Sequence, residues 1–179
     1  MRLTGIRVTN HGRLVDLSLE VQEHLVLVGP NDVGKSSLLR CLDLVLGANV
    51  AALYHRIEPS DFRLKDEPFV VEVDVGDLTQ DQEALFPDEI TVDTGTGKNR
   101  LTIRLEATLD VTDTLHVERI APDGGTGRQL SREQVASLGW ALLGATSISR
   151  DLREGRRTVV DEILQAIDLG SEQTDFESL

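Results

Sequence analysis

Hydrophobic and polar positions alternate over the first twenty residues of the chain. Apolar residues occupy alternate or nearly alternate positions in two stretches, residues 3–8 and residues 17–21. A period of two is typical of a strand with one buried face. The pattern therefore predicts two strands that pair across a turn over residues 10–16.

A short, continuous apolar run follows at His24–Val28 and ends in a Gly-Pro turn. A run of this kind is typical of a strand buried on both faces. Beyond the turn, leucines and valines recur at helical spacing from Leu38 to Leu46, and Gly47 lies where a C-terminal cap is expected. Residues 24–47 are therefore predicted to form a strand, a glycine-rich loop and a helix.

From about Pro59 onward the pattern becomes rich in predicted strands. Alternation returns over residues 69–75, 101–105 and 115–117, and turn-forming residues lie at 95–99 and 122–125. Residues 79–85 are predicted to form a short helix between two of these strands. The middle of the chain is thus expected to be an antiparallel meander.

The last third of the chain is predicted to be helical. Ser131 and Gln134 have the spacing of a capping box, which opens a helix expected to continue to about Leu143. Trp140 is expected to lie in the core or at a lobe interface. A second helix is predicted over residues 158–167, before an acidic tail. The expected division is a core over 1–58, a β-rich lobe of the same domain over 59–130, a helical segment over 131–170 and a tail over 171–179.

Composition narrows the class of protein. A chain of 179 residues with one cysteine, Cys41, has no internal disulfide and suits a reducing compartment. No apolar run approaches membrane-spanning length, so we expect a cytoplasmic protein without a membrane partner. The net charge of −13 argues against a direct grip on a phosphate backbone. The densest basic cluster, Arg150–Arg157, is expected to be a solvated surface.

One motif carries recognisable chemistry, the stretch from Gly29 to Ser36, which fits the pattern G-x-x-x-x-G-K-[ST]. Glycines at both ends let the backbone curl so that its N–H groups point at phosphate oxygens, and the following helix presents its positive end to them. Lys35 supplies a cation to the phosphates and is the expected catalytic residue. The Ser36 hydroxyl is the expected Mg²⁺ ligand. The predicted nucleotide-binding residues are Gly29, Pro30, Asn31, Asp32, Val33, Gly34, Lys35, Ser36 and Ser37.

Asp32 is unusual within this loop, because a carboxylate in an anion-binding loop repels the ligand. It is expected to face solvent or a partner surface and to lower nucleotide affinity.

Two other stretches resemble nucleotide motifs. Residues 95–98 read as half a phosphate loop but are expected to be a hairpin turn. Residues 159–162 resemble a Walker B ending, but their helical periodicity favours the first turn of a helix.

The first 47 residues resemble the N-terminus of ABC-type ATPases of the SMC and RecF class, and most closely the ATPase half of the OLD-family nucleases. The resemblance rests on a strand ending in Asn10, a second strand, and a third leading into the sequence GPNDVGKSSLL. Asn31 and the doubled serine Ser36-Ser37 match the usual G-x-N-x-x-G-K-S-S form. Residues 60–63 and 145–164 are also similar to segments of these nucleases.

The resemblance implies an α/β fold of the ABC/SMC head type, as a first lobe with an antiparallel β side lobe and C-terminal helices. It implies ATP and Mg²⁺ as ligands, a homodimer formed through the ATPase heads, and DNA as a partner of the complete protein only. The complete form would act in ATP-dependent DNA processing or phage defence.

Departures from the family pattern are also informative. Members often carry an aromatic and a basic residue directly after the strand-ending Asn, whereas this chain has His11 and Gly12, with Arg13 one place later. A nucleotide contact is therefore not expected there. The signature loop, Walker B acids, switch histidine and Toprim acids of the family have no convincing counterpart in the chain. The expected active site is thus incomplete, as in a fragment or a truncated protein.

Two alternatives stay open at this point. The first is a small self-contained P-loop enzyme such as a kinase; a GTPase is disfavoured because no [NT]-K-x-D element occurs. The second is an ATP-sensing regulatory module without catalysis, which the missing Walker B glutamate favours.

Overall fold

The computed structural model describes residues 1–143, except 96 and 125–126. Residues 1–140 form one compact unit, which contains every element named below. The predicted helix over 158–167, the Arg150–Arg157 cluster, the Walker B-like stretch and the acidic tail lie outside the described residues. The four-part division of the chain stays a prediction.

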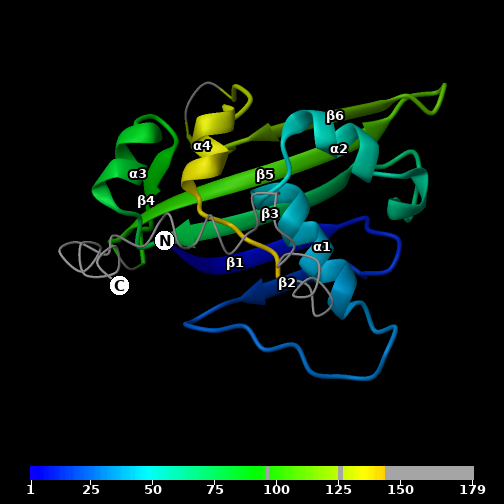
Figure 1. The fold of residues 1–179 in the computed structure, drawn as a ribbon, viewed down its shortest axis with the longest axis horizontal. Coiled ribbons are helices and arrows are strands. Elements are labelled where there is room, and N and C mark those ends of the chain that lie inside the picture. Colours follow the sequence, from blue (N-terminus) through cyan, green and yellow to red (C-terminus); the bar gives the residue numbers. More distant parts are fainter. Residues whose placement is uncertain (96, 125–126, 144–179) are drawn as a thin grey trace, which may run out of the picture. The chain divides into compact units, whose positions relative to one another are not determined.

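A mixed arrangement of strands and short helices makes up the described chain (Figure 1). The strands are β1 (Arg2–Thr9), β2 (Leu17–Glu20), β3 (Phe69–Gly76), β4 (Ile90–Val92), β5 (Asn99–Leu109) and β6 (Leu115–Ile120). The helices are α1 (Lys35–Leu46), α2 (Val50–Arg56), the 3-10 turn η1 (Pro59–Asp61), α3 (Gln80–Leu85) and α4 (Arg132–Ser137).

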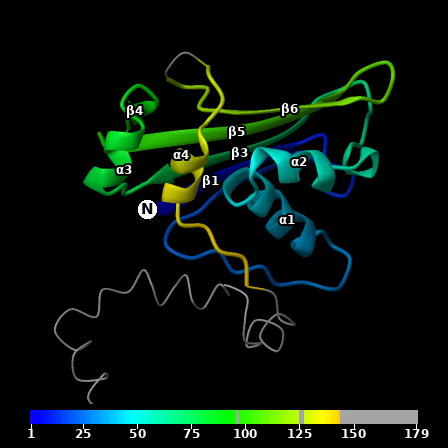
Figure 2. The ribbon, with the colours of Figure 1, turned by 45° about the horizontal axis from the view of Figure 1, so that its top comes forward.

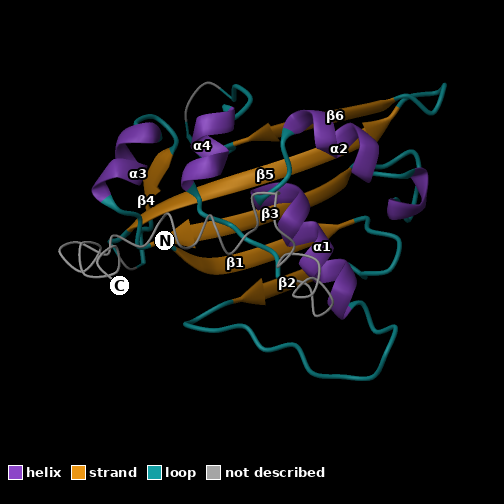
Figure 3. Cartoon of the chain, viewed as in Figure 1, coloured by secondary structure: helices purple, strands orange, loops and turns teal. Residues whose placement is uncertain are grey.

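The six strands form one antiparallel sheet in the order β2-β1-β3-β5-β4, with β6 also paired to β5 (Figure 3). β1 pairs with β2 across the predicted turn, and on its other side with β3, with Ile6 opposite Val73. The predicted strands over 3–8, 17–21, 69–75, 101–105 and 115–117 are thus confirmed. The β-rich middle extends the N-terminal hairpin, so the P-loop segment and α1 are inserted in the chain between β2 and β3, the two strands that flank β1.

Helices α1 and α2 cover one face of this sheet, α1 over β3 and β5 and α2 over β6 (Figures 1 and 2). The alternation in β3 explains why the helices cover this face, since Val71, Val73 and Val75 all point toward them and are fully buried. From α1, Leu42 and Val45 are buried in the same core. Burying each such side chain contributes about 1.5–3 kcal/mol, so this packing fixes the direction of α1.

A buried arginine holds the far end of α1. Arg119 on β6 is 2% exposed, and its Nη1 donates to the carbonyl oxygens of Ala48 at 2.6 Å and Val45 at 3.4 Å. These carbonyls lie at the negative end of the helix, where a cation is favoured. Burial lowers the pKa of Arg119 from its ordinary value. The β5–β6 hairpin is therefore tied to α1 by hydrogen bonds as well as by apolar contacts.

The segment before the P-loop differs from the sequence prediction. Residues 24–28 are extended but are not part of any described strand, and Val26 and Val28 are 76% and 88% exposed. The prediction of a strand buried on both faces is therefore wrong for this structure. Leu27 packs against the core, so one side of the run is covered. Burial of the other side needs a neighbour that the described part of the chain does not supply.

Helix α4 is shorter than predicted. The capping box is confirmed, because Ser131 and Gln134 exchange hydrogen bonds between side chain and backbone. The helix ends at Ser137, however, instead of continuing to about Leu143. Gly139 has a φ of 61°, a left-handed conformation that stops a helix. Trp140 then donates from Nε1 to Asp43 on α1 at 2.9 Å and packs partly buried against the core, in agreement with its predicted role.

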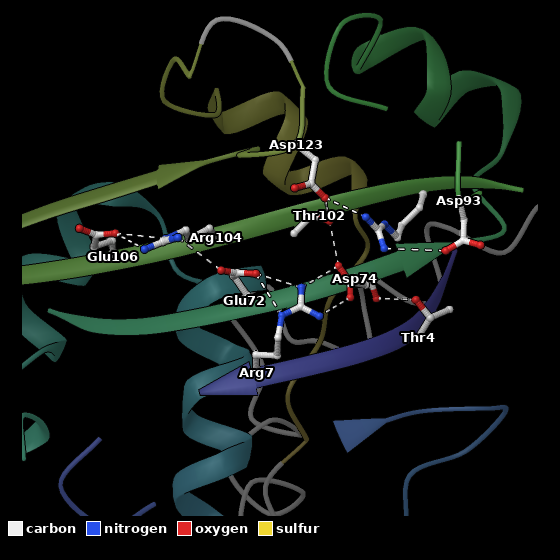
Figure 4. Close-up of polar contacts among 10 residues, drawn as sticks. Thr4, Arg7, Glu72, Asp74, Asp93, Thr102, Arg104, Glu106 and Asp123 are labelled. Atoms are coloured by element: carbon white, nitrogen blue, oxygen red, sulfur yellow. Dashed lines mark hydrogen bonds and ion pairs between the residues drawn. The ribbon is translucent and has the colours of Figure 1, made fainter. Parts of the chain in front are cut away.

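The sheet face away from α1 carries a network of charged and polar side chains (Figure 4). Arg7 on β1 donates to Asp74 at 2.7 Å and to Glu72 at 2.9 Å, both on β3. Thr102 on β5 donates to Asp74 at 2.8 Å. Gly5 leaves room for this carboxylate, since a Cβ there would lie 2.7 Å from it. Burial acts to raise the pKa of Asp74, but the hydrogen bonds from Arg7 and Thr102 outweigh it, and the pKa lies below its ordinary value.

Replacing Asp74 tests the strength of this network. Asp74→Asn keeps the shape but removes one of the two carboxylate charges that Arg7 faces, and should destabilise the fold by about 1–3 kcal/mol in urea unfolding at neutral pH. Because the folded-state pKa of Asp74 is depressed, the wild type should lose this part of its stability as pH falls below about 4. The difference between wild type and variant should therefore shrink with acidification.

Asp113→Asn is the matched control, because its pair with Lys65 joins two exposed side chains and should contribute less than about 1 kcal/mol. Equal urea midpoints for the two variants at neutral pH would contradict the prediction.

Gly34 gives a second test, at the start of α1. Its φ of 93° is unfavourable for residues with a side chain, and a Cβ would lie 2.6 Å from Cδ2 of the buried Leu14. Gly34→Ala should therefore cost about 2–4 kcal/mol of unfolding free energy. Gly139→Ala is the control, since its φ is 61° but a Cβ there meets nothing within 4 Å. Equal losses for both variants would show that contact with Leu14 contributes nothing.

Candidate functional site

The predicted nucleotide loop lines an open hollow of about 350 Å³. Two loops build it: the loop before α1 and the connection between β1 and β2. The lining residues are Arg13, Asn31, Asp32, Gly34, Lys35, Ser36 and Ser37. Six of the nine residues predicted from the sequence are thus brought together around one space.

Backbone geometry leaves donors free at the start of α1. Asp32 and Gly34 have positive φ values of 65° and 93°, so the chain turns sharply before the helix begins. Gly34 is the N-cap residue and has no side chain to accept from the first turn. Leu38 is the first residue of the helix whose N–H reaches a backbone carbonyl, that of Gly34. The N–H groups of residues 35–37 thus point out of the helix end, as an anion site requires.

Lys35 is turned back onto its own loop. Its Nζ donates to the carbonyl oxygens of Gly29, at 2.7 Å, and Pro30. Gly29 and Pro30 therefore contribute through their carbonyls rather than by lining the hollow. An incoming phosphate would compete with these carbonyls for the ammonium group.

The remaining loop residues occupy different positions around the hollow. Ser36 is exposed in the first turn of α1, where its hydroxyl is accessible. Asp32 is exposed, as expected, but it also lines the hollow. Val33 is 55% exposed and faces a neighbouring apolar hollow instead. Within the described residues, no group of three or more His, Cys, Asp or Glu side chains lies close enough to hold a metal ion. A metal at the hollow would therefore depend on hydroxyl oxygens such as that of Ser36 and on its other ligands.

Arg13, for which the sequence predicts no nucleotide contact, lies beside the P-loop in the structure. It lines the same hollow as Lys35 and is exposed, although it stands one place later than the basic residue of the resembled family. A tight turn absorbs the extra residue, because Nδ1 of His11 accepts hydrogen bonds from the N–H groups of Arg13, at 3.0 Å, and Leu14, at 3.3 Å. The signal in the sequence was the basic residue itself, which the shifted spacing obscured.

Two other features of the sequence, the Gly95–Lys98 stretch and Cys41, belong to a hairpin turn and to the core. The Gly95–Lys98 stretch lies in the β4–β5 hairpin, where the Asp93 N–H donates to the Lys98 carbonyl at 2.9 Å, so the hairpin prediction is confirmed. Cys41 is buried in the core, and burial raises the pKa of its thiol to about 12. A thiol of this kind stays protonated and unreactive.

Across the described residues, no helix combines the length and the apolar character that crossing a membrane requires.

The comparison with solved structures found a chain that shares 12% identity over 98% of this chain and 96% of its own length, with a TM-score of 0.47. It comes from work on "Structural biochemistry of ATP-driven dimerization and DNA stimulated activation of SMC ATPases". A comparison with curated proteins found no match.

Residues 1–135 match the family model described as an AAA ATPase domain, which covers about three quarters of the chain. Together with the sheet and helices described above, this match confirms the predicted α/β ATPase fold with an antiparallel β lobe. The chain therefore belongs to the AAA ATPase domain family.

Proposed function

We propose that this chain is the ATP-binding lobe of an OLD-like ATPase of the SMC/RecF type. The observation that carries the proposal is one hollow that combines the free N–H groups at the start of α1 with Lys35 and Arg13. The N–H groups and Arg13 adjoin this hollow, and Lys35 lines it while its Nζ donates to loop carbonyls with which a phosphate would compete. This combination of donors and cations suits a polyphosphate anion. Phosphate is the part of ATP that the lobe would hold.

The residues of the hollow fit ATP with Mg²⁺ in defined roles. Backbone N–H groups of the loop would bind phosphate oxygens, Lys35 would neutralise their charge, and the Ser36 hydroxyl would bind the metal. Mg²⁺ typically takes one or two protein oxygens, with phosphates and water as its other ligands. The Ser36 hydroxyl would therefore be sufficient to begin such a site.

The rest of the catalytic site would come from elsewhere. Asp32 is the one carboxylate among the described residues that line the hollow, and it lies in the loop itself rather than at the end of a neighbouring strand. The exposed side of residues 24–28 supports the same proposal, since an extended apolar segment beside a P-loop suits pairing with further strands. The water-activating acid would then accompany those strands.

In the complete protein, two such heads would dimerise around ATP in the cytoplasm, and the assembly would act on DNA or in phage defence. The negative charge of this chain supports a DNA contact through other parts of that protein.

A second candidate function is an ATP sensor without catalysis, favoured by the scarcity of carboxylates around the hollow. Measuring ATP hydrolysis distinguishes the ATPase lobe from the sensor, because a sensor binds ATP but does not hydrolyse it whichever partner is present.

Lys35→Ala tests nucleotide binding directly. Removing the ammonium group should weaken ATP–Mg²⁺ binding at least tenfold, because a charge-assisted hydrogen bond contributes about 1.5–3 kcal/mol. Isothermal titration calorimetry measures this. Lys65→Ala is the control, an exposed lysine paired with Asp113 away from the hollow, and should bind as the wild type does. Equal affinities for wild type and Lys35→Ala would refute the proposal, and steady turnover by the chain alone would refute the incomplete site.

Asp32→Asn should have the opposite effect. The substitution removes a negative charge at the hollow while keeping the size of the side chain, and asparagine tolerates the φ of 65°. Affinity for ATP should rise by about threefold to tenfold at low ionic strength, with a smaller gain in high salt. Titrations at two salt concentrations measure both effects. An unchanged or lower affinity would show that the carboxylate does not act on the phosphates.

A further inference from the structure

The connection between β1 and β2, which carries Arg13, is held in place by a segment fifty residues further along the chain. The Asn10 side chain donates to the carbonyls of Leu64 and Glu67, each at 2.8 Å, and accepts from the Leu64 N–H at 2.9 Å. The Gly12 N–H donates to the Asp61 carbonyl at 2.7 Å. Gly12 also passes so close that a Cβ there would lie 2.7 Å from the Ser60 carbonyl oxygen.

Side chains of the same segment connect this loop to α1. Asp61 is 5% exposed and forms a two-pronged ion pair with Arg40 on α1. Two residues later, Arg63 donates from Nη2 to the carbonyl oxygens of His11 and Leu14. The segment 58–64 thus bridges the P-loop helix and the loop that carries Arg13.

His11 lies at the centre of this arrangement. It is 3% exposed, packs edge-on against Phe69 at a ring distance of 5.4 Å, and accepts two backbone hydrogen bonds at Nδ1. Since Nδ1 accepts, the ring proton of the neutral form lies on Nε2, which is buried without a partner among the described residues. The turn that places Arg13 at the hollow therefore requires a neutral histidine.

We propose that His11, braced by Asp61 and Arg63, is a positioning residue that holds Arg13 against the nucleotide phosphates, and that protonation of its Nδ1 releases Arg13. The inference rests on the proposed ATP-binding function and adds the residues that control one side of that site. Neither His11 nor Arg63 touches the nucleotide. Both act through the backbone of the turn.

The charges around His11 set the direction of the effect. Burial lowers the pKa of His11; Asp61 opposes this, while Arg40, Arg13 and Arg63 add to it. The ring is therefore neutral at pH 7–8 and becomes charged only at lower pH. Protonation would replace two accepted hydrogen bonds with an N–H facing two N–H groups, so the turn would open as pH falls.

The experiment measures ATP–Mg²⁺ affinity of the full chain between pH 8 and pH 5.5, always as a ratio between wild type and Arg13→Ala. Protonation of ATP itself also weakens the contact with Arg13, so the non-titrating His11→Asn variant below serves as the reference for this effect. At pH 8 the ratio should be about tenfold, the contribution of one charged hydrogen bond. The ratio should fall toward one as the pH is lowered, because the His11 ring becomes charged only below its ordinary pKa range. Circular dichroism at each pH confirms that both proteins remain folded.

Two substitutions of His11 separate positioning from simple stability. His11→Asn retains an acceptor for the N–H two residues later and has no titrating group, so its affinity ratio to the matching Arg13→Ala double variant should stay near tenfold at both pH values. His11→Leu keeps the apolar contact with Phe69 but removes the acceptor. It should bind about tenfold more weakly than wild type at pH 8, and adding Arg13→Ala should weaken it no further.

The outcomes distinguish the two proposals. If ATP binding is absent or insensitive to Lys35→Ala, the proposed function fails. If binding depends on Lys35 but Arg13→Ala binds as the wild type does, the positioning inference is overturned and ATP binding stands. A wild-type ratio that stays at tenfold down to the lowest pH at which the protein is folded, with His11→Leu binding normally, overturns the inference as well.

Discussion

The packing of α1 against β3 and β5 is the constraint on which the rest of the structure depends. Its buried leucines and valines leave only one direction for the helix, and that direction decides where its uncapped N-terminus points. The phosphate-loop residues follow from it, because Gly34 can turn only where Leu14 leaves space. A small shift of this helix would move Lys35, Ser36 and the free N–H groups together.

Regular patterns in the sequence predict most of the sheet but not its order. Alternation identifies β3 because α1 covers only one of its faces, so Val71 and Val73 are buried while Glu72 is not. The same pattern does not say that β1 lies beside β3, since that pairing joins residues more than sixty positions apart. Which strands pair over this distance depends on the packing of the complete sheet, and the sequence of a single strand does not determine it.

The predictions that were wrong share one physical cause. An apolar run such as residues 24–28 predicts burial. Whether its side chains are buried depends on which other elements pack against them, and a local pattern does not contain that information. Helix α4 ends early because Gly139 adopts a left-handed backbone, which the preceding helical periodicity did not reveal. The prediction of no nucleotide contact at Arg13 stays untested, but the motif spacing did not indicate that Arg13 lines the hollow, because its place is set by a histidine lone pair and by residues 61–63. Motif spacing measures distance along the chain, whereas the site is assembled by contacts across it.

The buried Arg119 has a consequence for how the protein folds. Its hydrogen bonds to Ala48 and Val45 join positions more than seventy residues apart, and it cannot reach them until the β5–β6 hairpin has formed. Strand β3, against which α1 packs, also comes after the helix in the chain. During synthesis, therefore, the phosphate loop emerges early but acquires its final shape late, after about two thirds of the chain has been made. Long-range closure of this kind slows folding, so the apolar side chains of the α1 segment would stay exposed until the sheet that covers them is complete.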